Sequence, residues 1–307
     1  MKYIAPLYYR DFECIASACR NSCCVFWEVD IDADTLARYE SMSAPYGEKI
    51  RESIDRDGEA HFVLDSQGRC PHLTECGLCR IITECGEDAL SDICRDHPRY
   101  RSFYDGVTEI GLGLSCEEAT RLALDLTSPI GFLVSDSEDM TGAKMCREYP
   151  TELFCEDERP LLEEKRRLME IALDGARPLS DRLRELLPVM PDATQIRELY
   201  LSLECLDSSW REAIEGITDR ALCRDIEELS PFIERILLYV IYRHATAESF
   251  YEPRTVGAFA ALTACIVIAL SDSREDIPDV LRAYSSEIEY STENTERILD
   301  ALEELLA

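Results

Sequence analysis

Residues 70–99 read CPHLTECGLCRIITECGEDALSDICRDHPR and hold five of the fifteen cysteines of this 307-residue chain. A second group lies upstream, where residues 14–27 read CIASACRNSCCVFW, and Cys116 follows downstream. An isolated free cysteine is usually a small buried apolar residue. Cysteines gathered so densely instead indicate either a disulfide framework or a metal centre.

The amino terminus favours the metal centre. It reads MKYIAPLYYRDFEC, with charges and no apolar segment of a secretory signal, so we expect a cytoplasmic protein. Thiols stay reduced in most cytosols, and an odd number of cysteines is awkward for a complete disulfide framework. Disulfides remain the alternative. The longest apolar run, residues 255–270, is shorter than the roughly 20 residues of a membrane span, so we predict a buried helix and no membrane partner.

The chain is strongly acidic. It carries 62 Asp and Glu against 32 Lys and Arg, a formal net charge of −30. Such a surface repels phosphate backbones, so nucleic acid is excluded as a partner. A basic or lysine-bearing protein is attracted, although a solubilising acidic surface is the simpler explanation of the charge.

Periodicity predicts the fold class and the domains. The Asp105–Gly106 pair lies between alternating segments and favours a β-hairpin. Residues 159–175 have helical periodicity up to Gly175, and helical patterns continue to the carboxyl end. We predict an α+β, mostly α protein: a Cys-rich metal-binding domain over residues 1–125, a connecting region over 126–157 and an all-helical domain over 158–307. Three isolated cysteines of the last domain are predicted to be core residues: Cys205, Cys223 and Cys265.

The thiol spacing narrows the kind of metal site. Soft thiolates select zinc, copper(I) or iron–sulfur clusters. A zinc ribbon needs two C-x2-C pairs, but only Cys76 and Cys79 have that spacing. Of the adjacent Cys23 and Cys24, either one ligates while the other packs, or the two serve different metals. The C-x3-C-x2-C motif of radical S-adenosylmethionine enzymes fails, because Phe26 stands at its third position.

Several motifs together carry a family resemblance. They are Cys19-x3-Cys23-Cys24 with Trp27, Cys70-Pro-x-Leu, Gly77-Leu-Cys79-x-Ile, Gly86-x3-Leu90-x3-Cys94 with Pro98-Arg99, and Leu112-x-Leu114-Ser115-Cys116-x-Glu118-Ala119. Over about residues 8–125 the chain resembles the flagellin lysine-N-methylase family. The amino-terminal part of that family is similar to the CxxCxxCC zinc- or iron-chelating domains.

The resemblance implies an S-adenosylmethionine-dependent protein-lysine N-methyltransferase with a 4Fe-4S cluster, zinc being the alternative metal. Its acceptor would be lysine side chains of flagellin or another protein in the cytoplasm. Cys14 is a weaker match to the family pattern, and Cys76 and Cys85 are additional cysteines that do not match it. His72 and His97 lie where either could replace a thiol. The implied metal ligands are Cys19, Cys23, Cys24, Cys70, Cys79, Cys94 and Cys116.

The catalytic base and the methyl-donor site are left open by the sequence. Candidates for the base near the cysteines are Glu28, Asp96, Tyr100 and Tyr104. The helical part has no motif that matches the family. The alternative function is therefore a non-catalytic zinc- or iron-chelating or redox-sensing module with a helical protein-binding domain. The sequence does not determine the oligomeric state.

Overall fold

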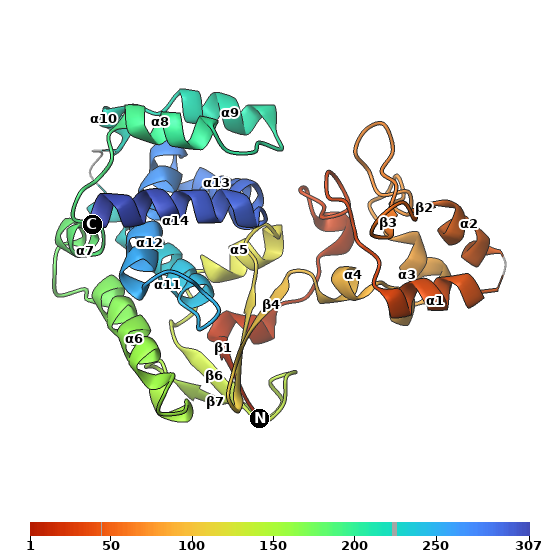
Figure 1. Ribbon diagram of the computed structural model, residues 1–307, viewed down its shortest axis with the longest axis horizontal. Coiled ribbons are helices and arrows are strands. Elements are labelled where there is room, and N and C mark those ends of the chain that lie inside the picture. Colours follow the sequence, from red (N-terminus) through yellow and green to blue (C-terminus); the bar gives the residue numbers. More distant parts are fainter. Residues whose placement is uncertain (44, 223–225) are drawn as a thin grey trace. The chain divides into compact units, whose positions relative to one another are not determined.

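The computed structural model describes residues 1–43, 45–222 and 226–307. They form two compact units (Figure 1). The first, here called the cysteine unit, comprises Glu13–Tyr100 and Cys116–Glu118. The second, the sheet–helix unit, comprises Met1–Phe12, Arg101–Ser115 and Ala119–Ala307. Helices outnumber strands by far, so the prediction of an α+β, mostly α protein is confirmed.

The division between the units differs from the predicted boundary near residue 125. The segments on either side of the cysteine-rich stretch pair in one sheet, because β1 runs parallel to β5 and antiparallel to β6. Residues 126–157, predicted to be a connection, supply β6 and β7 to the same sheet. Its order is β4 (Arg99–Tyr104), β5 (Val107–Leu112), β1 (Lys2–Pro6), β6 (Phe132–Ser135) and β7 (Lys144–Cys146).

The predicted hairpin at Asp105–Gly106 is present. It joins β4 to β5, and Gly106 has a φ of 77°, a left-handed conformation that glycine adopts without a steric penalty. All six residues of β5 are buried, because helices cover the sheet.

The helices of the sheet–helix unit pack around α12 (Pro253–Leu270). This helix is long and apolar enough to cross a membrane by length and composition, yet 72% of it is buried inside the protein, as in a core helix. Of the predicted core cysteines, Cys205 and Cys265 are half-buried, and Cys223 lies outside the described residues. The other helices are α5 (Glu117–Ala123), α6 (Arg159–Leu173), α7 (Leu179–Leu186), α8 (Ala193–Leu201), α9 (Ser208–Glu215), α10 (Asp219–Leu222), α11 (Ser230–His244), α13 (Ile277–Tyr284) and α14 (Thr292–Leu306), with a π-helical turn over Ser285–Glu289.

A buried ion pair joins the sheet to two helices of this unit. Lys165 of α6 and Glu109 of β5 are 0% and 1% exposed, and Lys165 Nζ lies 2.8 Å from both carboxylate oxygens. Lys165 also donates to the backbone carbonyl of Tyr242 at 2.8 Å. The hydroxyls of Tyr104 and Tyr149 donate to Glu109 at 2.9 and 2.5 Å. The charges are thus paired and hydrogen-bonded, as burial requires.

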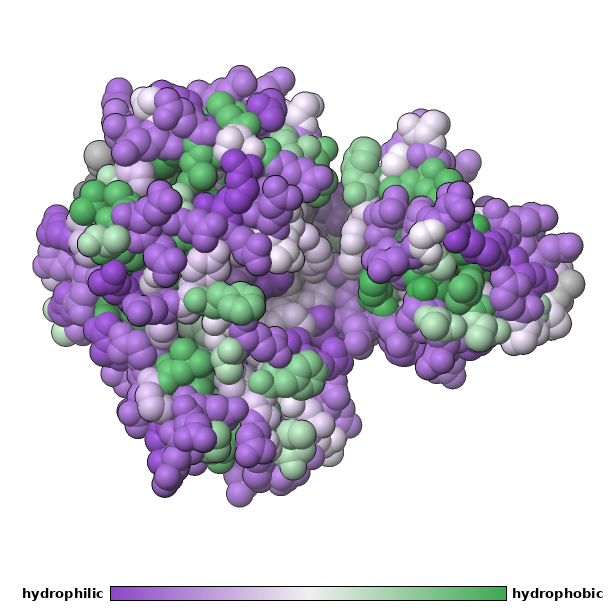
Figure 2. Space-filling view, viewed as in Figure 1, coloured by the Kyte–Doolittle hydropathy of each residue, from purple (hydrophilic) through white to green (hydrophobic). Residues whose placement is uncertain are grey.

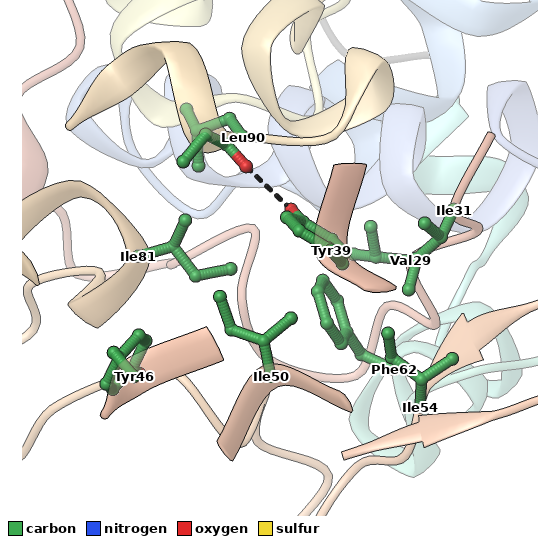
Figure 3. Close-up of a cluster of buried hydrophobic side chains, with 10 residues drawn as sticks. Val29, Ile31, Tyr39, Tyr46, Ile50, Ile54, Phe62, Ile81 and Leu90 are labelled. Carbon is green, nitrogen blue, oxygen red and sulfur yellow. Dashed lines mark hydrogen bonds between the residues drawn. The ribbon is translucent and has the colours of Figure 1, made fainter. Parts of the chain in front are cut away.

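The cysteine unit has a small core of its own. It contains α1 (Ala33–Ser41), α2 (Tyr46–Glu52), β2 (Ile54–Asp55), β3 (His61–Phe62), α3 (Arg80–Cys85) and α4 (Asp92–Asp96). Apolar side chains from these elements meet around Tyr39, Ile50 and Phe62 (Figure 3). The Tyr39 hydroxyl donates to the carbonyl of Ala89 at 2.8 Å and so ties α1 to the segment before α4.

Hydrophilic residues cover most of the face shown in Figure 2. This surface agrees with the high content of charged residues in the sequence.

Candidate metal centre

All ten cysteines of the amino-terminal third lie in the cysteine unit. The two cysteine-rich segments run side by side there. The amide of Cys70 donates to the carbonyl of Cys24 at 2.8 Å, and the amide of Phe26 donates to the carbonyl of Gly68 at 2.7 Å. Between them Val25 and Arg69 form an antiparallel bridge. Residues 24–26 and 68–70 are therefore held together by their backbones, independently of any metal.

Four of the seven predicted ligands form one electrostatically coupled group. We call Cys24, Cys70, Cys79 and Cys94 the first thiol set. Burial raises the pKa of Cys70 to about 12, and charge on any of the other three raises it as well. Burial raises the pKa of Cys94 to about 11, with Cys24 and Cys79 contributing. Burial and Cys24 raise the pKa of Cys79. Every pair within the set is thus coupled.

Local structure positions these thiols. Cys79 is the residue directly before α3, and both it and Cys94 are partly buried against the unit's hydrophobic core. The side chain of Ser91 caps α4 by accepting a hydrogen bond from the amide of Cys94 at 3.4 Å. One ligand candidate therefore directly precedes a short helix, and another lies within one.

The adjacent Cys23 and Cys24 differ in chemistry. The hydrogen bond between their thiols raises the pKa of Cys23 and lowers the pKa of Cys24. Ser22 also stabilises the Cys24 thiolate by a hydrogen bond. The thiolate is the form that binds metal, and the hydrogen bond lets the two residues share one thiolate.

Cys23 belongs to a second group. Charge on Cys14 and Cys116 raises its pKa, after the hydrogen bond with Cys24 and burial. Burial raises the pKa of Cys19 to about 11, and Cys116 contributes there too. We call Cys14, Cys19, Cys23 and Cys116 the second thiol set. Cys23 and Cys24 thus differ in their further neighbours, since Cys14 and Cys116 act on Cys23 whereas Cys24 acts on Cys70, Cys79 and Cys94.

Glu117 holds the second set together. Its carboxylate accepts hydrogen bonds from the backbone amides of Arg20 and Asn21 at 2.9 and 3.1 Å, and from both of their side chains. The Cys19 thiol lies 3.7 Å from the same carboxylate. Burial opposes ionisation of Glu117, but the bonds from Arg20 and Asn21 outweigh it and lower its pKa. The Cys19–Asn21 loop is thereby fixed beside Cys116.

We expect Glu117→Gln to loosen this loop. The glutamine keeps the shape, but its amide nitrogen cannot accept, and the charge that strengthens these hydrogen bonds is lost. Alkylation of Cys19 by a maleimide should become several-fold faster, as mass spectrometry of timed samples would measure. Glu87→Gln, at an exposed position of the same unit, is the control. Equal rates in the wild type and Glu117→Gln would contradict the role assigned to Glu117.

The predicted thiols do not, as they lie, surround a single ion. Within residues 1–43, 45–222 and 226–307, no three His, Cys, Asp or Glu side chains are grouped so that they could hold a metal ion. The first thiol set nevertheless has the donor type and number of a cysteine-bound cluster, four thiols of which one favours the thiolate. Four thiols are therefore chemically suited to bind a cluster, but among the described residues their side chains are not arranged around a metal ion.

Of the two histidines of the second segment, His72 is buried and His97 is half-buried, and both are neutral at pH 7. Both ring nitrogens of His72 are already hydrogen-bonded, to the hydroxyls of Tyr46 and Ser53 at 2.9 Å each. Burial lowers the pKa of His72 and of His97 to about 4. The His97 ring packs 4.8 Å from that of Trp27. As they lie, His72 supports the core, and His97 packs against an aromatic ring.

The structure does not bring the four candidates for the catalytic base together. Tyr104 lies in the sheet–helix unit, where it is hydrogen-bonded to the buried Glu109. Glu28, Asp96 and Tyr100 lie in the cysteine unit, and the side chain of Glu28 is 63% exposed. Sequence reasoning missed Glu117. Its position next to Cys116 was the available signal.

Comparison with known proteins identifies relatives. The chain is 29% identical over 127 residues to the lysine-N-methylase of Salmonella choleraesuis (strain SC-B67), which is 39% of this chain and 32% of that protein. The lysine-N-methylase of Salmonella typhimurium (strain LT2) matches with the same identity and coverage. The flagellar biosynthetic protein FliU of Salmonella muenchen is 27% identical over 151 residues, 47% of this chain and 88% of FliU.

The chain therefore matches about a third of the length of the two lysine-N-methylases. No family model matches it, and no solved structure matches it. The resemblance to flagellin lysine-N-methylases is confirmed by these relatives, whereas the link to CxxCxxCC chelating domains stays a prediction.

Proposed function

Because this chain is similar to lysine-N-methylases over 39% of its length, we propose that it transfers a methyl group from S-adenosylmethionine to lysine side chains of a protein, with flagellin as the acceptor. The name of its relative FliU supports a flagellar acceptor. The observation that carries the proposal is the combination of this relationship with four mutually coupled thiols in one unit.

The proposed cofactor is a 4Fe-4S cluster held by the first thiol set. Cysteine thiolates are the usual ligands of such clusters, and four of them are needed. The second thiol set supports the Cys19–Asn21 loop in this proposal.

The acceptor lysine must lose a proton before it can accept a methyl group. A free lysine has a pKa of about 10.4, so it arrives at the enzyme as an ammonium. A protein with a net charge of −30 attracts such a cation and raises its local concentration. The acidic surface therefore favours encounter with a lysine-bearing partner, and deprotonation has to follow close to the methyl donor.

The test is chemical analysis of protein purified without oxygen. We expect about four irons and four sulfides per chain, a brown solution, and transfer of labelled methyl from S-adenosylmethionine to purified flagellin. Flagellin with acetylated lysines is the control acceptor and should stay unlabelled. One or two zinc ions without sulfide would overturn the proposal and favour the non-catalytic metal-stapled module.

A further inference from the structure

The sheet–helix unit contains a small cavity beside the end of β1. Its volume is about 30 Å³, room for about two water-sized groups. Apolar side chains of Leu7, Ile130 and Phe132 form part of the wall. Tyr8 and Arg235 of α11 also line it. The cavity thus combines apolar walls with two strong hydrogen-bond donors.

The hydroxyl of Tyr8 is unused. It is buried, and no hydrogen-bond partner reaches it within the described part of the chain. The two other tyrosines of the wall are engaged. Tyr239 accepts from the amide of Leu114 and donates to Glu289 at 2.9 Å, and Tyr242 donates to the carbonyl of Ile4 at 2.9 Å. Burying a polar group without a hydrogen-bond partner costs free energy. A ligand atom that accepts a hydrogen bond from the Tyr8 hydroxyl would remove this cost.

Arg235 brings a positive charge that lacks a direct counterion. Its Nη2 donates to the carbonyl of Ser128 at 2.5 Å, and among the described residues it has no carboxylate within ion-pair distance. Asp125 and Glu234 act on it only at longer range. Glu289, the carboxylate that acts on Tyr8, is already bound by His244 at 2.9 Å and lies 3.7 Å from Arg243. The cavity therefore offers donors and net positive charge inside an acidic protein.

We propose that this cavity binds the carboxylate group of a small ligand, with the Tyr8 hydroxyl and the Arg235 guanidinium as donors. A planar guanidinium fork matches a carboxylate. A planar carboxylate, with two oxygens, suits the small volume better than a larger oxyanion. Apolar walls suit the carbon chain that follows. No group of this site takes part in the proposed methyl transfer, so the two proposals stand independently.

Acetate with a labelled methyl group is the probe. It is titrated into the full chain in exchange for chloride, so that the ionic strength stays constant, and NMR of the methyl group reports binding. Saturable binding in the millimolar range is expected for so small a ligand. Tyr8→Phe removes one oxygen and should weaken acetate binding about tenfold, as loss of a hydrogen bond to a charged group does. Arg235→Lys keeps the charge, loses the fork, and should weaken binding at least as much.

Tyr3→Phe, in β1 but outside the cavity wall, is the matched control and should bind acetate like the wild type. Methylammonium, of similar size and opposite charge, should not bind. Circular dichroism of Tyr8→Phe verifies that the variant is folded. Acetate affinity unchanged in folded Tyr8→Phe, or equal binding of methylammonium, would overturn the assignment.

Discussion

Serine in place of Cys70, Cys79 or Cys94 is expected to reduce iron from about four per chain to less than one and to abolish methyl transfer. A serine hydroxyl is not ionised at neutral pH and is a poor ligand for iron, whereas these thiols form the coupled first set. Iron and sulfide content of anaerobically purified variants measures the first effect, and labelled methyl transfer measures the second.

The chain offers matched controls for this experiment. Cys76 and Cys85 lie in the same segment but outside the coupled set, so Cys76→Ser and Cys85→Ser should keep iron and activity. The neighbouring pair gives a sharper contrast, since Cys24→Ser should lose iron and Cys23→Ser should retain most of it. Iron loss in Cys23→Ser together with retention in Cys24→Ser would contradict the assignment of the two sets.

Lys165→Met is expected to destabilise the protein by about 3 kcal/mol, because it leaves the Glu109 carboxylate buried without its cation. The two tyrosine hydroxyls that donate to Glu109 compensate only part of the lost charge interaction. Urea denaturation followed by circular dichroism measures the free energy of unfolding. The Lys165→Met, Glu109→Leu double variant should lose less stability than Lys165→Met, since no unpaired charge remains buried.

Arg167→Met is the control on the same helix. Arg167 pairs with Glu164 on the surface, where the arginine side chain is 50% exposed, and such pairs contribute about 0–1 kcal/mol. A loss in Lys165→Met no larger than in Arg167→Met would show that the buried pair does not hold β5 to α6.

The density of cysteines in residues 14–27 and 70–99 was sufficient to predict which segments make up the candidate site. Spacing alone could not tell which of Cys23 and Cys24 belongs with which other thiols. The two residues are adjacent, so their distances along the chain to every other cysteine differ by only one residue. Their division depends on which thiols lie across from each in space, and on the hydrogen bond between them. The role of Glu117 depends on a contact with Arg20 and Asn21, almost a hundred residues away.

The sequence by itself determined the fold class, the Asp105–Gly106 hairpin and most of the helices, because these follow from short-range periodicity and turn chemistry. Only the tertiary structure decided where the units divide, since the parallel pairing of β1 with β5 joins segments about a hundred residues apart. The same holds for the Glu109–Lys165 pair and for the cavity beside Tyr8. Each arises from burial, which depends on how distant segments pack and leaves no local pattern in the chain.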